Sequence, residues 1–187
     1  MHILIVNNNT RYLDILQKLF LNHHTQIFNR ELYRHDANRL KEFDAIVLSG
    51  GGPHTVARKH KLYQEEIHTI RHANVPIVGI CLGFELIVYA FGGTLKELPQ
   101  RVKGMYEIHV MRDDPMFAGT KTLQVFENHR WTVHKLPSVL EPLAQSATGV
   151  EITKHASRPI WGFQFHPEVD VPGQNNLLVE LLRTISH

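Results

Sequence analysis

The chain has 187 residues, with 20 lysine and arginine residues against 18 aspartate and glutamate residues and a formal net charge of +2. This length fits a single domain over residues 1–187, and the small charge excludes a surface that follows nucleic-acid phosphates. The single cysteine excludes an internal disulfide, and the apolar N-terminal run ends at Asn7, which is too short for a signal peptide or a membrane span. We therefore expect a cytoplasmic protein with no membrane or nucleic-acid partner.

Short apolar runs rich in valine and isoleucine alternate with helix-like segments in the first half of the chain. Strands are predicted over residues 3–6, 25–28, 43–48 and 76–80, and helices over residues 12–21, 61–72 and 84–91. This alternation is typical of a parallel sheet that is covered on both faces.

From residue 94 onward the pattern changes to short alternating strands. They are predicted over residues 106–111, 122–126, 143–146 and 159–163, followed by a helix over residues 174–185. The predicted fold class is α/β, an open and mostly parallel twisted sheet with helices on both faces and added antiparallel strands.

The segment Gly79-Ile80-Cys81-Leu82-Gly83 lies between a predicted strand and a predicted helix. It has the form of a nucleophile elbow with cysteine in place of serine, because two glycines permit a sharp strained turn. Backbone amides and the helix dipole at the first helical turn are expected to favour a thiolate. The alternative is a buried structural thiol, since the pattern alone occurs by chance.

A histidine motif, Phe165-His166-Pro167-Glu168, follows the predicted strand over residues 159–163. Pro167 ends the strand and would hold His166 at its tip, where it could face a nucleophile at another strand end. Glu168 could fix the tautomer by bonding one ring nitrogen. In a chain with 14 histidines, an ordinary surface histidine is the alternative.

A glycine-rich turn, Ser49-Gly50-Gly51-Gly52-Pro53, follows the third predicted strand. Its backbone amides could point at a developing negative charge. The turn lacks the Lys-Ser/Thr ending of a phosphate-binding loop, so a nucleotide site is rejected, and the alternative is simply a tight turn.

Together these three features, in this order, resemble the class I (triad-type) glutamine amidotransferases. Glu127-Asn128-His129 looks like the Asn/Ser-His element of that family, and the stretch over residues 154–162 is similar to GMP synthetase amidotransferase subunits. The resemblance covers nearly the whole chain and implies a flavodoxin-like fold.

The resemblance implies Cys81 as nucleophile, His166 as general base and acid, and Glu168 as the residue that orients His166. It further implies an oxyanion hole from the backbone amides of Gly52 and Leu82. The implied substrate is glutamine or a γ-glutamyl compound. The residues expected to bind it are Gly51, Glu85, Asn128, His129, Arg130 and Trp131.

The sequence departs from the family after the elbow. The family usually has His-Gln or Met-Gln, whereas Phe84-Glu85 follows Gly83 here and looks like the γ-glutamyl hydrolases. Glu85, four residues after Cys81, would lie on the same helical face and could accept hydrogen bonds from a substrate ammonium. An exposed helix glutamate is the alternative.

No metal or cofactor is expected. His68 and His72 lie four residues apart on a predicted helix and could share a metal, but two ligands are too few, so a solvated helix face is the preferred interpretation.

Three functions remain open. The first is a glutaminase subunit that supplies ammonia to a separate ATP-dependent synthetase such as GMP synthetase, because the chain has no ATP-binding motif. The second is a stand-alone γ-glutamyl hydrolase that acts on γ-glutamyl amides or peptides. The third is a catalytically silent regulatory or binding domain that retains the fold.

Overall fold

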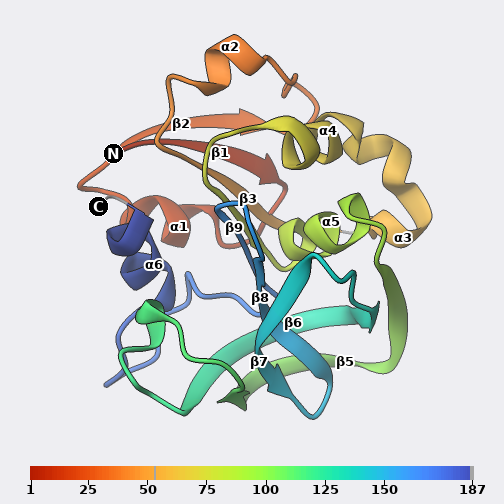
Figure 1. The fold of residues 1–187 in the computed structure, drawn as a ribbon, viewed down its shortest axis with the longest axis vertical. Coiled ribbons are helices and arrows are strands. Elements are labelled where there is room, and N and C mark those ends of the chain that lie inside the picture. Colours follow the sequence, from red (N-terminus) through yellow and green to blue (C-terminus); the bar gives the residue numbers. More distant parts are fainter. Residues whose placement is uncertain (53, 186–187) are drawn as a thin grey trace.

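The computed structural model describes residues 1–52 and 54–185. Across these residues one nine-stranded sheet has the order β2-β1-β3-β4-β9-β8-β7-β5-β6 (Figure 1). The strands are β1 His2–Asn8, β2 His24–Asn29, β3 Ala45–Gly51, β4 Ile77–Ile80, β5 Thr94–Val110, β6 Thr122–Lys135, β7 Leu140–Ser146, β8 Gly149–His155 and β9 Ile160–Phe163. The helices are α1 Leu13–Leu19, α2 Ala37–Leu40, α3 Val56–Lys59, α4 Gln64–His72, α5 Leu82–Ala90 and α6 Leu177–Ile185, with 3-10 turns η1 His60–Tyr63 and η2 Pro115–Phe117.

The strands β2, β1, β3 and β4 are parallel, as the apolar runs predict. The strand over residues 159–163, which was predicted among the added antiparallel strands, is β9, and it extends the parallel half because it pairs parallel with β4 and antiparallel only with β8. α1 and α6 bury their apolar side chains in one cluster against this sheet. α3, α4 and α5 contribute to a second cluster on the other face, and Figure 1 shows the two helical layers on opposite sides. The predicted α/β class is confirmed, and the carboxyl ends of the parallel strands form one common edge.

The remaining strands, β8, β7, β5 and β6, pair antiparallel. β5 and β6 are much longer than the predicted strands over residues 106–111 and 122–126, and β6 continues through residues 127–135. β8 was not predicted at all. Its buried residues include Glu151 and Thr153, so the strand lacks the apolar alternation that would indicate it.

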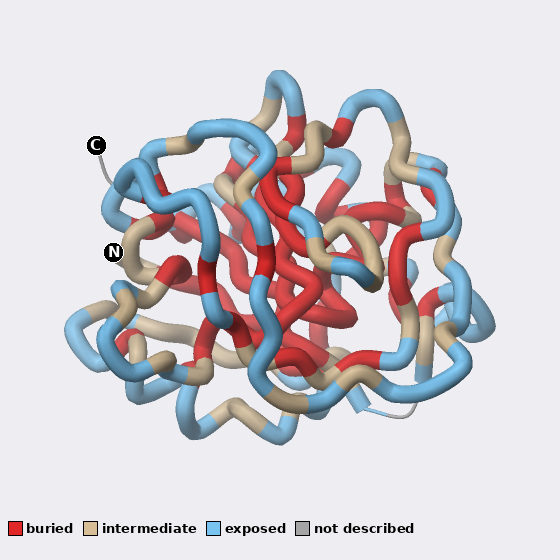
Figure 2. The backbone as a smooth tube through the Cα atoms, turned by 90° about the horizontal axis from the view of Figure 1, so that it is seen from below, coloured by how far each residue is buried: buried red, intermediate tan, exposed pale blue. Residues whose placement is uncertain are grey.

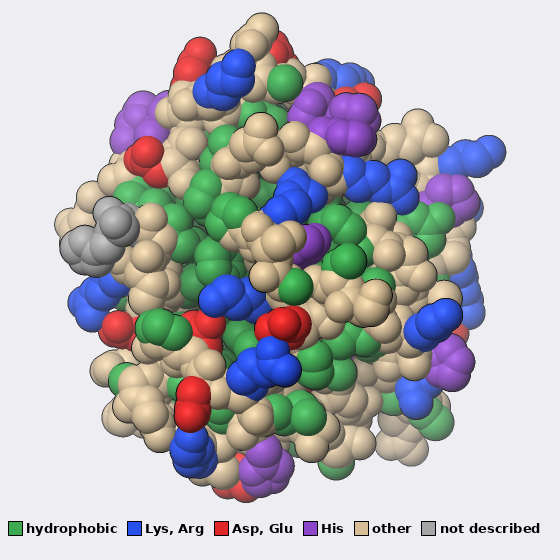
Figure 3. Space-filling view, viewed as in Figure 1, with side chains coloured by type: hydrophobic (Ala, Val, Ile, Leu, Met, Phe, Trp, Pro, Cys, Tyr) green, Lys and Arg blue, Asp and Glu red, His purple; other side chains and the backbone are tan. Residues whose placement is uncertain are grey.

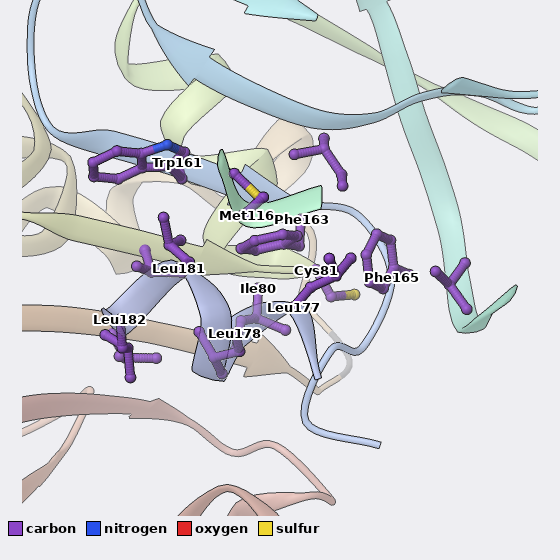
Figure 4. Close-up of a cluster of buried hydrophobic side chains, with 14 of the residues drawn as sticks. Ile80, Cys81, Met116, Trp161, Phe163, Phe165, Leu177, Leu178, Leu181 and Leu182 are labelled. Carbon is purple, nitrogen blue, oxygen red and sulfur yellow. The ribbon is translucent and has the colours of Figure 1, made fainter. Parts of the chain in front are cut away.

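Buried segments run through the centre of the molecule and exposed segments surround them (Figure 2). Cys81 belongs to the hydrophobic cluster that α6 covers. Figure 4 shows its sulfur at one end of this cluster, near Phe165 and Leu177. Among the described helices, none is both long and apolar enough to cross a bilayer.

A buried carboxyl group lies near the glycine-rich turn. Glu66 of α4 is 0% exposed, and its Oε1 accepts a hydrogen bond from Nδ2 of Asn8 at 2.8 Å. Asn8 also donates its backbone N–H to Oγ of Ser49 at 2.9 Å, which links the carboxyl group to the start of the turn. Burial raises the pKa of Glu66 from its ordinary value of 4.5 to about 7.

Glu66→Gln is expected to raise stability at pH 8 more than at pH 5. Because the folded protein keeps the Glu66 proton up to about pH 7 while the unfolded chain releases it earlier, the free energy of unfolding of the wild type falls as pH rises through this window. Glutamine has no such dependence, so we expect a relative gain of about 1–3 kcal/mol at pH 8. Urea unfolding at both pH values measures it, with exposed Glu42→Gln as control. The same difference between variant and wild type at both pH values would contradict the assignment.

Candidate active site

Cys81 lies in a strained turn between β4 and α5. Its backbone has φ 50° and ψ −101°, a conformation that residues other than glycine rarely adopt. The two flanking glycines pack backbone against backbone, since a Cβ on Gly79 would lie 2.5 Å from the carbonyl of Gly83 and a Cβ on Gly83 would lie 2.2 Å from the carbonyl oxygen of Leu48. The Cys81 amide donates to the carbonyl oxygen of Phe163 at 2.7 Å, which ties the elbow to β9. The predicted elbow geometry is present.

The expectation that the helix N-terminus favours a thiolate is wrong for this site at rest. Burial raises the pKa of Cys81 well above its ordinary value, and the carboxylates of Glu85, Glu168 and Glu127 raise it further. The neighbouring Leu82 amide lowers the pKa of the thiol, but this effect is smaller. The thiol therefore needs a base that removes its proton.

His166 and Glu168 form a buried pair. Nδ1 of His166 lies 2.8 Å from Oε1 of Glu168, and the two side chains are 4% and 1% exposed. The His166 amide also donates to the carbonyl oxygen of Phe126 on β6 at 2.9 Å, which fixes the backbone of the motif. With the proton on Nδ1, the ring presents an unprotonated Nε2 as a base.

Gly50, which was not predicted as a site residue, lies beside both the nucleophile and the base. A Cβ at this position would lie 2.9 Å from Cε1 of His166 and 3.6 Å from Cβ of Cys81. Both side chains therefore pack against the same bare backbone. The glycine-rich turn indicated Gly50 only as part of an amide-rich segment, not as the space that the imidazole occupies.

Tyr12 is a second residue that the sequence did not indicate. Its ring packs on the His166 ring with centroids 4.5 Å apart, and its hydroxyl accepts a hydrogen bond from Nδ2 of Asn128 at 2.9 Å. Asn128 is 116 positions away in the chain. Such a contact leaves no local sequence signal.

A pocket of about 420 Å³ opens beside Cys81. Its lining includes all the predicted substrate-binding residues and both predicted oxyanion-hole residues, namely Gly51, Gly52, Leu82, Glu85, Asn128, His129, Arg130 and Trp131. His166 and Glu168 are not among its lining residues. A volume of this size accommodates a small-molecule substrate.

Of the two predicted oxyanion donors, the Leu82 amide lies at the first turn of α5, directly after Cys81. The Gly52 amide donates to the carbonyl oxygen of Asn8 at 3.3 Å, a long bond. An oxyanion near Cys81 would compete with that carbonyl for the Gly52 amide.

Glu85 is buried in the wall of this pocket rather than exposed. It is 4% exposed, and its amide donates to the carbonyl oxygen of Cys81 at 3.0 Å, one helical turn back. Burial raises the pKa of Glu85 to about 7, and the nearby His129 partly opposes this. A substrate ammonium placed against the carboxyl group would favour its ionised form.

Residues 128–131 lie on β6, where its pairing with β5 is irregular. The register passes from Glu97↔Trp131 to Val102↔His129, which leaves Arg130 between them. Nε of Arg130 lies 3.0 Å from a Glu97 oxygen, and the guanidinium of Arg58 lies 5.2 Å from the centre of the Trp131 ring. Arg58 also pairs with Glu97, at 2.6 Å, but Lys59 and Arg101 line the pocket as well. Cations therefore outnumber carboxylates around the pocket, which suits a substrate carboxylate.

Known proteins are similar to this chain over most of its length. The family described as "Glutamine amidotransferase class-I" matches residues 5–181. A glutamine-hydrolyzing GMP synthase component of Methanobrevibacter smithii is 32% identical over 173 residues, covering 90% of this chain and 87% of the relative. The protein of the same name from Saccharolobus solfataricus is 36% identical over 132 residues, 70% of each chain.

Solved structures are also similar. The crystal structure of a Thermoplasma acidophilum protein described as a GMP synthase component superposes with a TM-score of 0.87 at 27% identity, covering 100% of this chain and 94% of that one. A glutamine amidotransferase from Thermotoga maritima has the same fold, with a TM-score of 0.75 at 20% identity and coverage of 100% and 82%. Since the family match extends over nearly the whole sequence, the chain belongs to the class I glutamine amidotransferase family.

Proposed function

We propose that this protein hydrolyses the side-chain amide of glutamine through a cysteinyl thioester and supplies the ammonia to a GMP synthetase. The observation that carries the proposal is the packing of Cys81 and the His166–Glu168 pair against Gly50, beside a pocket large enough for an amino acid. The relatives described as glutamine-hydrolyzing GMP synthase components support the assignment to GMP formation. A single unpaired thiol suits the reducing cytoplasm.

In this mechanism Nε2 of His166 takes the proton from Cys81, and the thiolate attacks the amide carbon of glutamine. The Leu82 and Gly52 amides stabilise the oxyanion that forms on the carbonyl oxygen. His166 then returns the proton to the leaving nitrogen, so that ammonia departs and a γ-glutamyl thioester remains. Water, activated by the same imidazole, cleaves the thioester to glutamate and regenerates the thiol. Glu168 stabilises the imidazolium in both halves of the reaction.

The proposed partner is a separate ATP-dependent synthetase. Ammonia release from glutamine, measured with and without a GMP synthetase, tests this part of the proposal. We expect the synthetase to raise glutaminase turnover. Full activity on γ-glutamyl peptides and no response to the synthetase would instead favour a stand-alone γ-glutamyl hydrolase.

One observation favours that second function. Glu85 places a buried carboxyl group in the pocket, where the family usually has glutamine. Such a group can accept charge-assisted hydrogen bonds from the α-ammonium of a γ-glutamyl substrate, worth about 1.5–3 kcal/mol.

Glu85→Gln is therefore expected to lower kcat/KM for a γ-glutamyl dipeptide by about tenfold or more, or to shift preference toward free glutamine. Steady-state kinetics on both substrates measure the change. Glu107→Gln, an exposed glutamate on β5, is the matched control. Unchanged kcat/KM for both substrates would show that Glu85 does not determine specificity.

The third function, a silent binding domain, is tested by a thiol-reactive glutamine analogue. The proposal requires covalent labelling of Cys81 that glutamine suppresses. A protein that remains unlabelled would be a binding or regulatory domain.

A further inference from the structure

Three buried side chains converge behind the pocket wall, on two strands that are not neighbours in the sheet. Glu127 and His129 lie on β6, and Glu151 lies on β8. One ligand atom from each, two carboxylate oxygens and an imidazole nitrogen, all lie within 4.8 Å of one another. The three residues are no more than 2% exposed.

The groups that surround the cluster orient two of these side chains. Nδ1 of His129 lies 2.8 Å from the carbonyl oxygen of Trp131, so that Nδ1–H donates outward and Nε2 faces the two carboxyl groups. Oε1 of Glu151 accepts from Oγ of Ser146 at 2.6 Å and Oγ1 of Thr148 at 3.1 Å. A backbone carbonyl behind the imidazole and hydroxyls behind the carboxylate are typical of the outer shell of a metal site.

The inward-facing atoms make no hydrogen bond, although Glu127 and His129 lie at ion-pair distance from each other. Both oxygens of Glu127, Oε2 of Glu151 and Nε2 of His129 have no hydrogen bond to the described residues. Oε2 of Glu127 lies 3.0 Å from Nε2 of His129, which is close enough for an ion pair, but the two atoms are not aligned for a hydrogen bond. Two buried carboxylates that share a single imidazole are costly when both are ionised, unless a further positive charge lies between them.

We propose that Glu127, His129 and Glu151 bind one divalent transition-metal ion, of the class of Mn²⁺ or Zn²⁺. The mixed set of two carboxylates and one imidazole suits these ions better than Mg²⁺, which prefers oxygen ligands alone. The ion would join β6 to β8 and fix His129, which lines the pocket, so its role is positioning and not catalysis. The sequence predicts no metal here because the ligands come from two strands that are separated in the sheet by β7 and β5.

A surface cluster could also bind metal and must be separated from this site. His35 joins His68 and His72, with ring centroids 4.4 Å apart in both adjacent pairs, and Figure 3 shows histidines grouped over α4. These side chains are exposed or half-buried, and an all-imidazole set favours Zn²⁺ over Mn²⁺. Mn²⁺ is therefore the better probe of the buried site.

The test is a Mn²⁺ titration of the chelator-treated full chain without substrate, followed by the loss of the free Mn²⁺ paramagnetic resonance signal. We expect one saturable site per chain and a higher Tm on saturation. The isosteric variants Glu127→Gln and Glu151→Gln should each weaken binding by about tenfold or more. His68→Ala, which alters only the surface cluster, should bind Mn²⁺ like the wild type.

Circular dichroism identifies any variant that fails to fold, and the wild-type titration decides the proposal without the variants. Absence of saturable binding and of any Tm response in the wild type would overturn it. Binding that Glu127→Gln and Glu151→Gln retain but His68→Ala loses would move the site to the histidines. Because no readout involves glutamine, these results are independent of the proposed activity.

Discussion

Cys81→Ala is expected to lower glutamine hydrolysis by about 10⁴-fold or more, because no other thiol in the chain can form the thioester. The fold should survive, since the side chain lies at the end of its cluster and alanine removes only the sulfur. Ammonia release and circular dichroism are measured on the same preparation. Cys81→Ser, which keeps a hydroxyl group, is the close variant and should also be inactive.

Substantial turnover of Cys81→Ala would remove the cysteine from the mechanism. Loss of turnover together with loss of the native dichroism spectrum would instead indicate a structural thiol. Alanine and serine both keep a Cβ at the strained φ of 50°, so neither substitution changes the backbone strain at this position. A loss of the native spectrum would therefore be caused by the loss of the sulfur.

His166→Ala is expected to cost nearly as much as the loss of the cysteine. Because burial and the surrounding carboxylates raise the pKa of the Cys81 thiol, few molecules carry a thiolate at neutral pH unless the imidazole takes the proton. Members of a catalytic unit are not additive, so removing the base alone disables most of the unit.

Glu168→Gln keeps the shape of the partner of His166 but removes its charge, so we expect a smaller loss than for His166→Ala. The ranking of kcat/KM among wild type, Glu168→Gln and His166→Ala is the measurement. His134→Ala, an exposed histidine on β6, is the matched control. If His166→Ala had wild-type activity, His166 would not be the base.

The parallel half of the fold and the elbow could be predicted because their signals are local. Buried parallel strands appear as continuous apolar runs, and the turn around Cys81 is specified by glycines two positions away on each side. The order of the glycine turn, the elbow and the histidine motif indicated the class I glutamine amidotransferases. The family assignment that rested on this order is confirmed.

What could not be predicted depends on pairing between distant segments. β8 carries the buried Glu151, and the extension of β6 carries Glu127 and His129, so neither shows a simple apolar alternation. The packing of Tyr12 on His166 and the place of Gly50 depend on how separate loops meet. The thiol was assigned the wrong pKa direction because the helix N-terminus is visible in the sequence, whereas the three carboxylates around the sulfur are brought together only by folding.

The buried carboxyl groups also change the electrical behaviour of the whole molecule. The formal net charge of +2 counts every carboxyl group as ionised, yet Glu66 and Glu85 have pKa values of about 7 in the folded protein. Near pH 6 these two groups therefore carry more protons in the native chain than in the unfolded chain, whereas His23, His35 and His155, whose pKa values burial lowers, carry fewer. The two carboxyl groups take up protons when the chain folds at that pH, so the calorimetric enthalpy of unfolding should depend on the ionisation enthalpy of the buffer in wild type, and less so in a Glu66→Gln, Glu85→Gln double variant.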